Sequence, residues 1–280
     1  MDSKHSAINL WPLLKSAIHD IQKKNNAHLK FEELYQYAYL MVRNDYGKEL
    51  YKNIKDSISN RLVYEVRREI LHSLPNNFLS TLIESWNDFR VEMVMIRDIF
   101  MYLDRVYVDI NELESVYNVG LILFREEIIK HEVISNNLRS ILLQMIMTER
   151  KGKTIDRRSL KNVCSMLVSL GINSNILYEE EFENAFLEQS KQFYREESCK
   201  FLLENDVKSY VEKVQLRFQE ELERARECLT ETSEKRILEI LEEELIRKNI
   251  TVVPELKNSD MVHALKFYKT NDLADKNVCH

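Results

Sequence analysis

Glycine and proline are scarce in this sequence, which holds four of the first and three of the second among its 280 residues. Globular chains usually contain roughly 12 % of these two residues together. Tight turns and sheet corners depend on them, so a chain with so few has little means of building a β-sheet. Leu, Glu, Lys and Arg, which favour helices, are abundant instead. The composition therefore predicts an all-α fold.

Cysteine is also rare, and its four copies are widely spaced, at Cys164, Cys199, Cys228 and Cys279. They form no CxxC motif, and no Cys and His residues follow the spacing of a zinc site. We expect neither a zinc site nor a disulfide framework. Reduced thiols of this kind are typical of a cytoplasmic or nuclear protein.

Long apolar runs and blocks of one charge are missing as well. The apolar runs are far shorter than a membrane span needs, and the first residues, MDSKHSAINLW, lack the features of a signal peptide. The 46 acidic and 40 basic side chains are intermixed and give a net charge of −6. Nucleic-acid binders usually carry a basic patch or stripe. We therefore expect neither a membrane nor a nucleic acid as a partner.

No constellation of residues points to catalysis. The seven histidines are scattered, and none pairs with Cys or Ser at a diagnostic spacing. The sequence has no glycine-rich phosphate loop, no HExxH and no nucleophile elbow. Most Asp and Glu residues lie on mixed-charge helix faces, where exposure to water explains them. The sequence predicts a protein that is not an enzyme and that binds no cofactor and no metal ion.

What the chain does contain is apolar residues at helical spacing, in two sets of five segments. The expected helices of the first set span about 8–24, 28–44, 51–72, 76–107 and 112–131. Those of the second set span about 138–152, 155–170, 175–203, 207–229 and 237–246. Two sets of equal number and similar length favour a helical repeat protein.

The mixed-charge stretch from Glu212 to Lys248 allows a second interpretation. Its apolar positions are flanked by Glu and Arg, as they are in coiled coils. A homodimeric coiled coil would need a longer unbroken heptad pattern. We therefore favour repeat helices with one solvated face, and the coiled coil remains the alternative.

The segment FEELYQYAYLMV places apolar residues on two faces of one helix. Phe31, Tyr35 and Tyr39 form one stripe, and Leu34, Ala38 and Met41 form another. A surface helix normally buries only one such stripe, so the second is either part of the core or offered to a partner. Tyrosine favours a partner, because its polar tip suits a surface that is wet when free and dry when bound.

This segment also opens a series of strings that resembles the cullin family. FEELYQYAYLMV is followed by WNDF, MVMIRDIFMYLDRVYV, YNVGLILFREEI, TERKGKTIDRRSLKNVC and YEEEFENAFLEQS. The strings keep the order and spacing found in cullins, from about Ile8 to about Leu273. They are most similar to the cullin that binds BTB-domain adaptors.

The resemblance implies an elongated, right-handed stack of five-helix cullin repeats, an α-solenoid-like rod. It places repeat one, which binds the adaptor, at 1–133 and repeat two at 134–250. The start of an incomplete third repeat and a polar tail would occupy 251–280. It also implies a non-catalytic scaffold of a cullin–RING ubiquitin ligase, which binds the BTB domain of substrate adaptors with one chain for each BTB subunit.

The family's adaptor-binding positions correspond to seven residues of this chain. They lie on the FEELYQY helix, just before it, and on the later MYLDRVYV segment: Leu29, Phe31, Glu32, Tyr35, Tyr39, Tyr102 and Arg105. Two alternatives remain open. Leu29, Phe31, Tyr35 and Tyr39 could all be core residues, and Arg105 could simply pair with Asp98 or Asp104.

Two departures from the family pattern carry expectations of their own. The chain ends near the start of a third repeat, so we expect no binding of the RING-box protein, which the C-terminal half of a cullin holds. It also begins close to its first helix, so we expect the N-terminal arm of the BTB-binding cullin to be absent. A helical tethering or assembly protein with no link to ubiquitin is the rival hypothesis.

Overall fold

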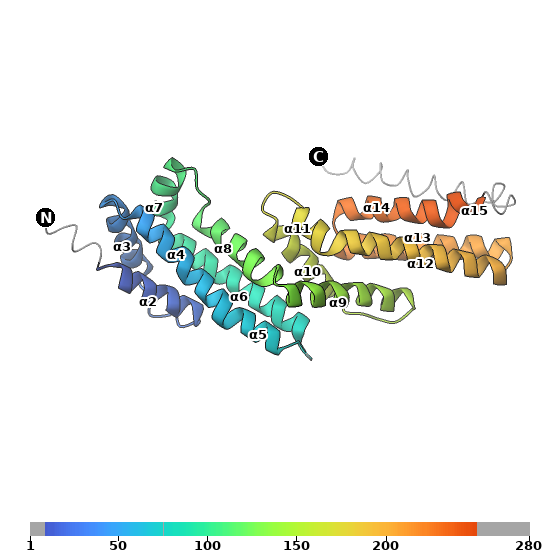
Figure 1. Cartoon of the computed structure of the whole chain (residues 1–280), viewed down its shortest axis with the longest axis horizontal. Helices are drawn as coiled ribbons and strands as arrows, with labels where there is room; N and C mark the ends of the chain where they lie inside the picture. The colour runs from blue at the N-terminus through green and yellow to red at the C-terminus, as the bar shows by residue number, and fades with distance from the viewer. Residues whose placement is uncertain (1–8, 75, 251–280) are drawn as a thin grey trace. The chain divides into compact units, whose positions relative to one another are not determined.

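The computed structural model describes residues 9–74 and 76–250. Within these ranges the chain is helical apart from short connections, and no residue lies in a β-strand (Figure 1). The all-α prediction is confirmed. The expected opening of a third repeat, at 251–280, lies outside the described residues.

The helices of the first half include short π-helical turns, labelled η, that continue an α-helix or join two. Their bounds are α2 (Trp11–Gln22), α3 (Phe31–Arg43), α4 (Gly47–Arg61), η1 (Leu62–Val66), α5 (Arg67–His72), α6 (Phe78–Ile99), α7 (Met101–Leu103), η2 (Asp104–Val108), α8 (Val116–Phe124) and η3 (Arg125–Ile129).

The second half continues in the same way. Its elements are α9 (Glu132–Arg150), α10 (Arg157–Leu170), α11 (Ile176–Tyr178), η4 (Glu179–Glu183), α12 (Asn184–Glu204), α13 (Val207–Cys228), α14 (Glu231–Leu241), η5 (Glu242–Arg247) and α15 (Lys248–Ile250). These bounds follow the predicted segments closely, because apolar periodicity reports which residues face a core.

One predicted helix is wrong in its extent. The segment expected to run from about 76 to 107 breaks at Phe100, whose φ of −99° and ψ of 16° lie outside the helical region. Neither proline nor glycine marks the break. The side chains of Phe100 and Leu103 are fully buried, and α7 packs against α3 and not only against the end of α6. Tertiary packing therefore outweighs the continuous helical pattern of the sequence.

The chain divides into two compact units. The first holds the described residues up to Ser140 together with Met166–Asn175, and the second holds Ile141–Ser165 and the described residues from Ile176 onward. The repeat boundaries near 133 and 250 remain predictions.

The first unit is a helical bundle in which α6 packs against α2, α3, α5 and α8, and α4 against α3 and α8 (Figure 1). An aromatic cluster lies at its centre. The ring of Phe124 lies 5.2 Å from that of Trp86 and 5.0 Å from that of Phe89. Each of these large buried side chains contributes about 1.5–3 kcal/mol to stability.

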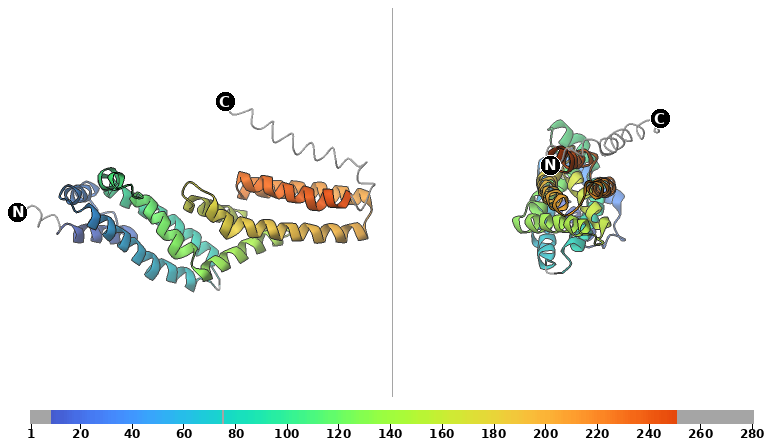
Figure 2. Two further views of the ribbon diagram at one scale, coloured as in Figure 1. Left: turned by 45° about the horizontal axis from the view of Figure 1, so that its top comes forward. Right: turned by 90° about the vertical axis from the view of Figure 1, so that its right-hand side faces the viewer.

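The second unit contains the stretch that offered the coiled-coil alternative. There, α13 and α14 pack against each other and both against α12, so the three helices lie side by side (Figures 1 and 2). The chain breaks between them, where the Thr230 side chain caps the start of α14 by accepting a hydrogen bond from the Ser233 backbone N–H. Residues 212–248 are therefore bundle helices and not one continuous heptad helix.

The second unit also contains buried ion pairs. The Nε of Arg150 lies 2.8 Å from a carboxylate oxygen of Glu221, and both side chains are at most 1 % exposed. The Arg150 guanidinium also donates to the Ser190 hydroxyl at 2.7 Å. Arg224, from the same helix as Glu221, pairs with Glu221 and with Glu149. Buried charges require such partners because leaving water is costly.

Candidate protein-interaction surface

The two apolar stripes of α3 have different environments. Leu34, Ala38 and Met41 are buried in the first unit. On the other stripe, Phe31 is 38 % exposed, and Tyr35 and Tyr39 are partly exposed. The alternative left open above was that Leu29, Phe31, Tyr35 and Tyr39 are all core residues. It is wrong for Phe31 and for both tyrosines. This stripe faces the surface.

The ends of α3 are stabilised locally. Glu32 and Glu33 lie in its first turn, where carboxylates interact favourably with the helix dipole. At the other end, the side-chain amide of Asn44 donates to the Leu40 carbonyl oxygen at 2.8 Å. Charged and polar residues at the two termini thus fix a short helix whose exposed stripe is largely aromatic.

The break at Phe100 brings a second element to this stripe. The ring centroids of Tyr39 and Tyr102 lie 4.6 Å apart with a tilt of 57°, an arrangement that aromatic pairs favour. Tyr102 is itself only partly buried. Arg43, one turn after Tyr39, donates to its hydroxyl oxygen at 3.3 Å and lies 6.0 Å from its ring centre. Tyr39 is therefore held in place and remains accessible.

Beside this pair the surface is hollowed. An open hollow of about 550 Å³ lies along α3 and reaches α6. Its lining includes three of the predicted residues, and the complete set is Phe31, Glu32, Glu33, Tyr35, Gln36, Tyr37 and Asp98. A hollow lined by aromatic rings and carboxylates can receive a side chain of a protein partner.

Arg105 makes neither of the ion pairs that were left open for it. Asp98 pairs with Arg97 at 2.8 Å. Asp104 accepts a hydrogen bond from the Val116 backbone N–H at 2.9 Å; burial raises the pKa of Asp104, and this hydrogen bond opposes the rise. Arg105 is exposed, and no partner is found for its guanidinium within residues 9–74 and 76–250. It is available to bind a carboxylate of another protein.

The seven predicted residues are thus only partly brought together. Phe31, Glu32 and Tyr35 share the hollow, while Tyr39 and Tyr102 share a ring contact. The two others lie apart: Leu29 is in the turn before α3, where its backbone N–H donates to the Asn26 carbonyl oxygen, and Arg105 lies on η2.

Comparison with known proteins now identifies the family. Residues 11–275 match the family model of the cullin alpha solenoid domain. The chain belongs to the cullin family. This match also confirms the helical repeat architecture that the resemblance implied.

Several curated cullins are similar to the chain over most of its length. Cullin-3 of Caenorhabditis elegans is 40 % identical over 267 residues, which cover 94 % of this chain and 34 % of that protein. Cullin-3 of Dictyostelium discoideum is 37 % identical, with the same shares covered. Cullin-3B of Arabidopsis thaliana is 35 % identical over 98 % of this chain and 37 % of its own length. The chain spans about a third of the length of these relatives.

Sequence reasoning missed several residues of this cullin surface, among them Arg43 and Asp98. Arg43 carried a usable signal, since it stands four residues after Tyr39 and shares its helix face. Asp98 carried none, because its position beside Phe31 and Tyr35 depends on how α6 packs against α3.

No helix among the described residues is long and apolar enough to cross a bilayer. In the same part of the chain, no three His, Cys, Asp or Glu side chains are grouped as they would be around a metal ion.

Proposed function

We propose that this cullin chain binds the BTB domain of substrate adaptors through the surface formed by Phe31, Tyr35, Tyr39 and Tyr102, named here the tyrosine face. In this role it acts as the adaptor-binding part of a non-catalytic ubiquitin-ligase scaffold. The observation that carries the proposal is the contact between Tyr39 and Tyr102, two accessible rings held 4.6 Å apart.

The chemistry of the tyrosine face supports a tight and specific contact. A few Tyr, Trp and Arg side chains supply most of the binding energy in protein interfaces. Here Arg43 fixes Tyr39 before any partner arrives, so less side-chain entropy is lost on binding. The free guanidinium of Arg105 adds a charge that selects for a carboxylate in the partner.

The proposal includes a stoichiometry. BTB domains form two-fold dimers, and each half of such a dimer offers the same surface. One chain therefore occupies each BTB subunit. Within this proposal the chain works in the cytoplasm or nucleus, which fits the free thiols of Cys164, Cys199 and Cys228.

Adaptor choice tests the proposed function. The chain should form a complex with a purified BTB dimer in size-exclusion chromatography with light scattering, at two chains per dimer. It should form none with a Skp-type adaptor or with elongin C at the same concentrations. The cullin solenoid is common to the family, so the side chains of the tyrosine face, together with Arg105, must distinguish the adaptors.

Two outcomes would contradict this function. Equal binding to all three adaptors would remove the assignment to BTB domains. Binding to none would instead favour the rival hypothesis, a helical tethering or assembly protein without a role in ubiquitin transfer.

A further inference from the structure

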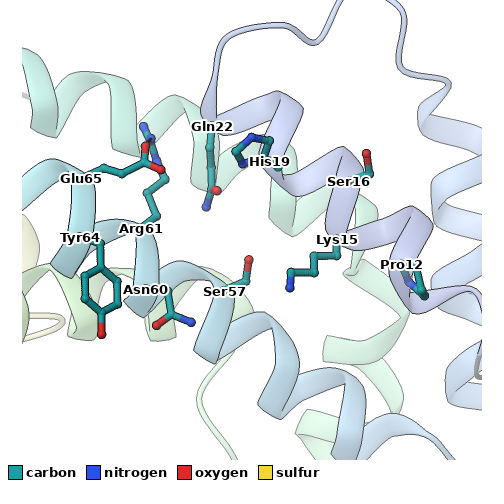
Figure 3. Close-up of a pocket in the computed structure, with 10 residues that line it drawn as sticks. All are labelled: Pro12, Lys15, Ser16, His19, Gln22, Ser57, Asn60, Arg61, Tyr64 and Glu65. Atoms are coloured by element: carbon teal, nitrogen blue, oxygen red, sulfur yellow. Dashed lines mark hydrogen bonds and ion pairs between the residues drawn. The ribbon is translucent and has the colours of Figure 1, made fainter.

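Many charged side chains of this chain are paired along or across its helices. Arg61 and Glu65, which line the polar groove between α2 and the α4–η1 segment, are an example: a guanidinium nitrogen of Arg61 lies 3.1 Å from a carboxylate oxygen of Glu65 (Figure 3). The connection from α9 to α10, in the second unit, is different (Figure 1). It carries two exposed lysines, Lys151 and Lys153, whose ammonium groups pair with no residue in the ranges 9–74 and 76–250.

The α9–α10 connection is a stretch of irregular, exposed backbone. It lies between the end of α9 at Arg150 and the start of α10 at Arg157. Gly152, with a φ of +79°, forms the turn that ends α9, and every residue from 151 to 154 is exposed. The backbone N–H groups of Thr154 and Ile155 make no hydrogen bond to another described residue. A segment with so few hydrogen bonds can enter the cleft of another protein at little cost.

Thr154 is the reactive group of this connection. Its side chain is exposed, and within the part of the chain that the structure describes its hydroxyl forms no hydrogen bond. Lys151 precedes it by three positions and Lys153 by one, and the apolar Ile155 follows directly. Kinases select substrates by such charge patterns. Basic residues ahead of a free hydroxyl suit a kinase whose substrate cleft is acidic.

The sequence offers a second hydroxyl nearby, that of Ser159, which directly follows two arginines. The structure disfavours it. The Ser159 hydroxyl donates to a carboxylate oxygen of Asp156 at 2.6 Å, and its backbone already belongs to α10. Arg157 is occupied as well, since its Nε lies 2.6 Å from a carboxylate oxygen of Glu149. A kinase would have to unwind the helix and break these contacts to reach Ser159, whereas Thr154 requires neither.

We propose that Thr154 is a phosphorylation site for a basophilic protein kinase. The kinase transfers the γ-phosphoryl group of ATP to Oγ1 of Thr154. The bond between the γ-phosphorus and the bridging oxygen breaks as the new P–O bond forms, and ADP leaves with the electron pair. The hydroxyl proton passes to a carboxylate of the kinase. Lys151 and Lys153 supply the charges that select this class of kinase.

The surroundings of Thr154 can hold the product. A phosphothreonine carries a charge of about −1.5 to −2 at pH 7. Lys151 and Lys153 would offset this charge, and the exposed Arg158 lies in the first turn of α10. The phosphate would also lie just before the N-terminus of α10, where the helix dipole stabilises negative charge. Phosphorylation therefore removes the positive charge of the connection without opposing the fold.

Phosphorylation of the whole folded chain in vitro tests this inference. The chain is incubated with ATP and the catalytic fragment of protein kinase C, a basophilic kinase, and is then cleaved after glutamate. Mass spectrometry should place the phosphate on Thr154 in the fragment 150–179, which also contains Ser159. Thr154→Val should abolish labelling of this fragment. Casein kinase 2, which selects acidic surroundings, should leave the fragment unlabelled.

The lysines provide a matched comparison. Combining Lys151→Gln with Lys153→Gln should lower the kcat/KM of phosphorylation by about tenfold or more, because the charges that the kinase recognises are lost. Lys161→Gln, at an exposed lysine on α10, should leave it unchanged.

Four outcomes would overturn the inference: no phosphate in fragment 150–179, phosphate on Ser159 instead of Thr154, labelling only after denaturation, or an unchanged kcat/KM for the double lysine variant. The assay contains no adaptor, and none of these residues belongs to the tyrosine face. A failure of BTB binding would therefore leave the result intact.

Discussion

Replacing Arg150 by methionine should lower the free energy of unfolding by about 3–5 kcal/mol. Methionine keeps an unbranched chain about as long as the arginine stem but removes the guanidinium group and its charge. Glu221 would then remain almost completely buried with one cation fewer, and Ser190 would lose its guanidinium donor. The rings of Phe186, Phe193 and Tyr194, which lie 5.0–5.6 Å from the guanidinium, would lose a cation–π contact.

Urea denaturation followed by far-UV circular dichroism measures this loss. Arg158→Met is the matched control, because Arg158 is an exposed arginine at the start of α10, and it should change stability by less than about 0.5 kcal/mol. A loss below about 1 kcal/mol for Arg150→Met would show that the buried ion pairs are not coupled as their geometry implies.

The pH dependence of the free energy of unfolding tests the same ion pairs independently. Burial opposes ionisation of Glu221, but the charges of Arg150 and Arg224 outweigh it and lower the pKa of Glu221 from 4.5 to about 2. A lowered pKa stabilises the fold above pH 4.5, and the stabilisation, about 3 kcal/mol, is lost as the pH falls from 4.5 through 2. The difference between wild type and Arg150→Met should therefore be constant above pH 5 and shrink toward pH 2.

Substituting Tyr39 by alanine should weaken binding to a BTB domain by about 2 kcal/mol or more, roughly a thirtyfold rise in dissociation constant. The fold should survive, because Tyr39 is partly exposed and the buried stripe of α3 is untouched. Tyr64→Ala, at an exposed tyrosine on η1, is the control and should bind BTB domains as wild type does. Isothermal titration calorimetry measures both.

Tyr102 should prove coupled to Tyr39 in this measurement. Their rings touch. The binding energy lost by the double variant should therefore be smaller than the sum of the losses of the two single variants, by about 0.5–1.5 kcal/mol. Additive losses would mean that the two rings act on different parts of the adaptor. If Tyr39→Ala unfolds the chain, Tyr39 is a core residue and not part of the binding surface.

The division of α3 into a buried and an exposed stripe could be predicted from the sequence, because side chains three and four residues apart share one helix face. The break at Phe100 could not, since no glycine or proline marks it and Ile96, Ile99 and Leu103 keep a regular helical pattern. Periodicity therefore placed Tyr102 on the wrong helix.

The tyrosine face and the buried charges show two further limits of sequence reasoning. Family resemblance placed Tyr39 and Tyr102 among the adaptor-binding positions but did not predict that their rings touch, because they lie 63 positions apart and have no local signal in common. Glu221 and Arg150 are separated by 71 residues, and their mixed-charge surroundings favoured exposure to water. Only tertiary packing shows that these two charges are buried.

Hydrogen–deuterium exchange of the chain with and without a BTB domain tests the central claim most directly. Amides of α3 (Phe31–Arg43) and of the α7–η2 segment should exchange more slowly in the complex, while those of α12, α13 and α14 should be unchanged. Protection confined to the second unit, or to α2 and α4, would contradict the claim that the adaptor binds the tyrosine face.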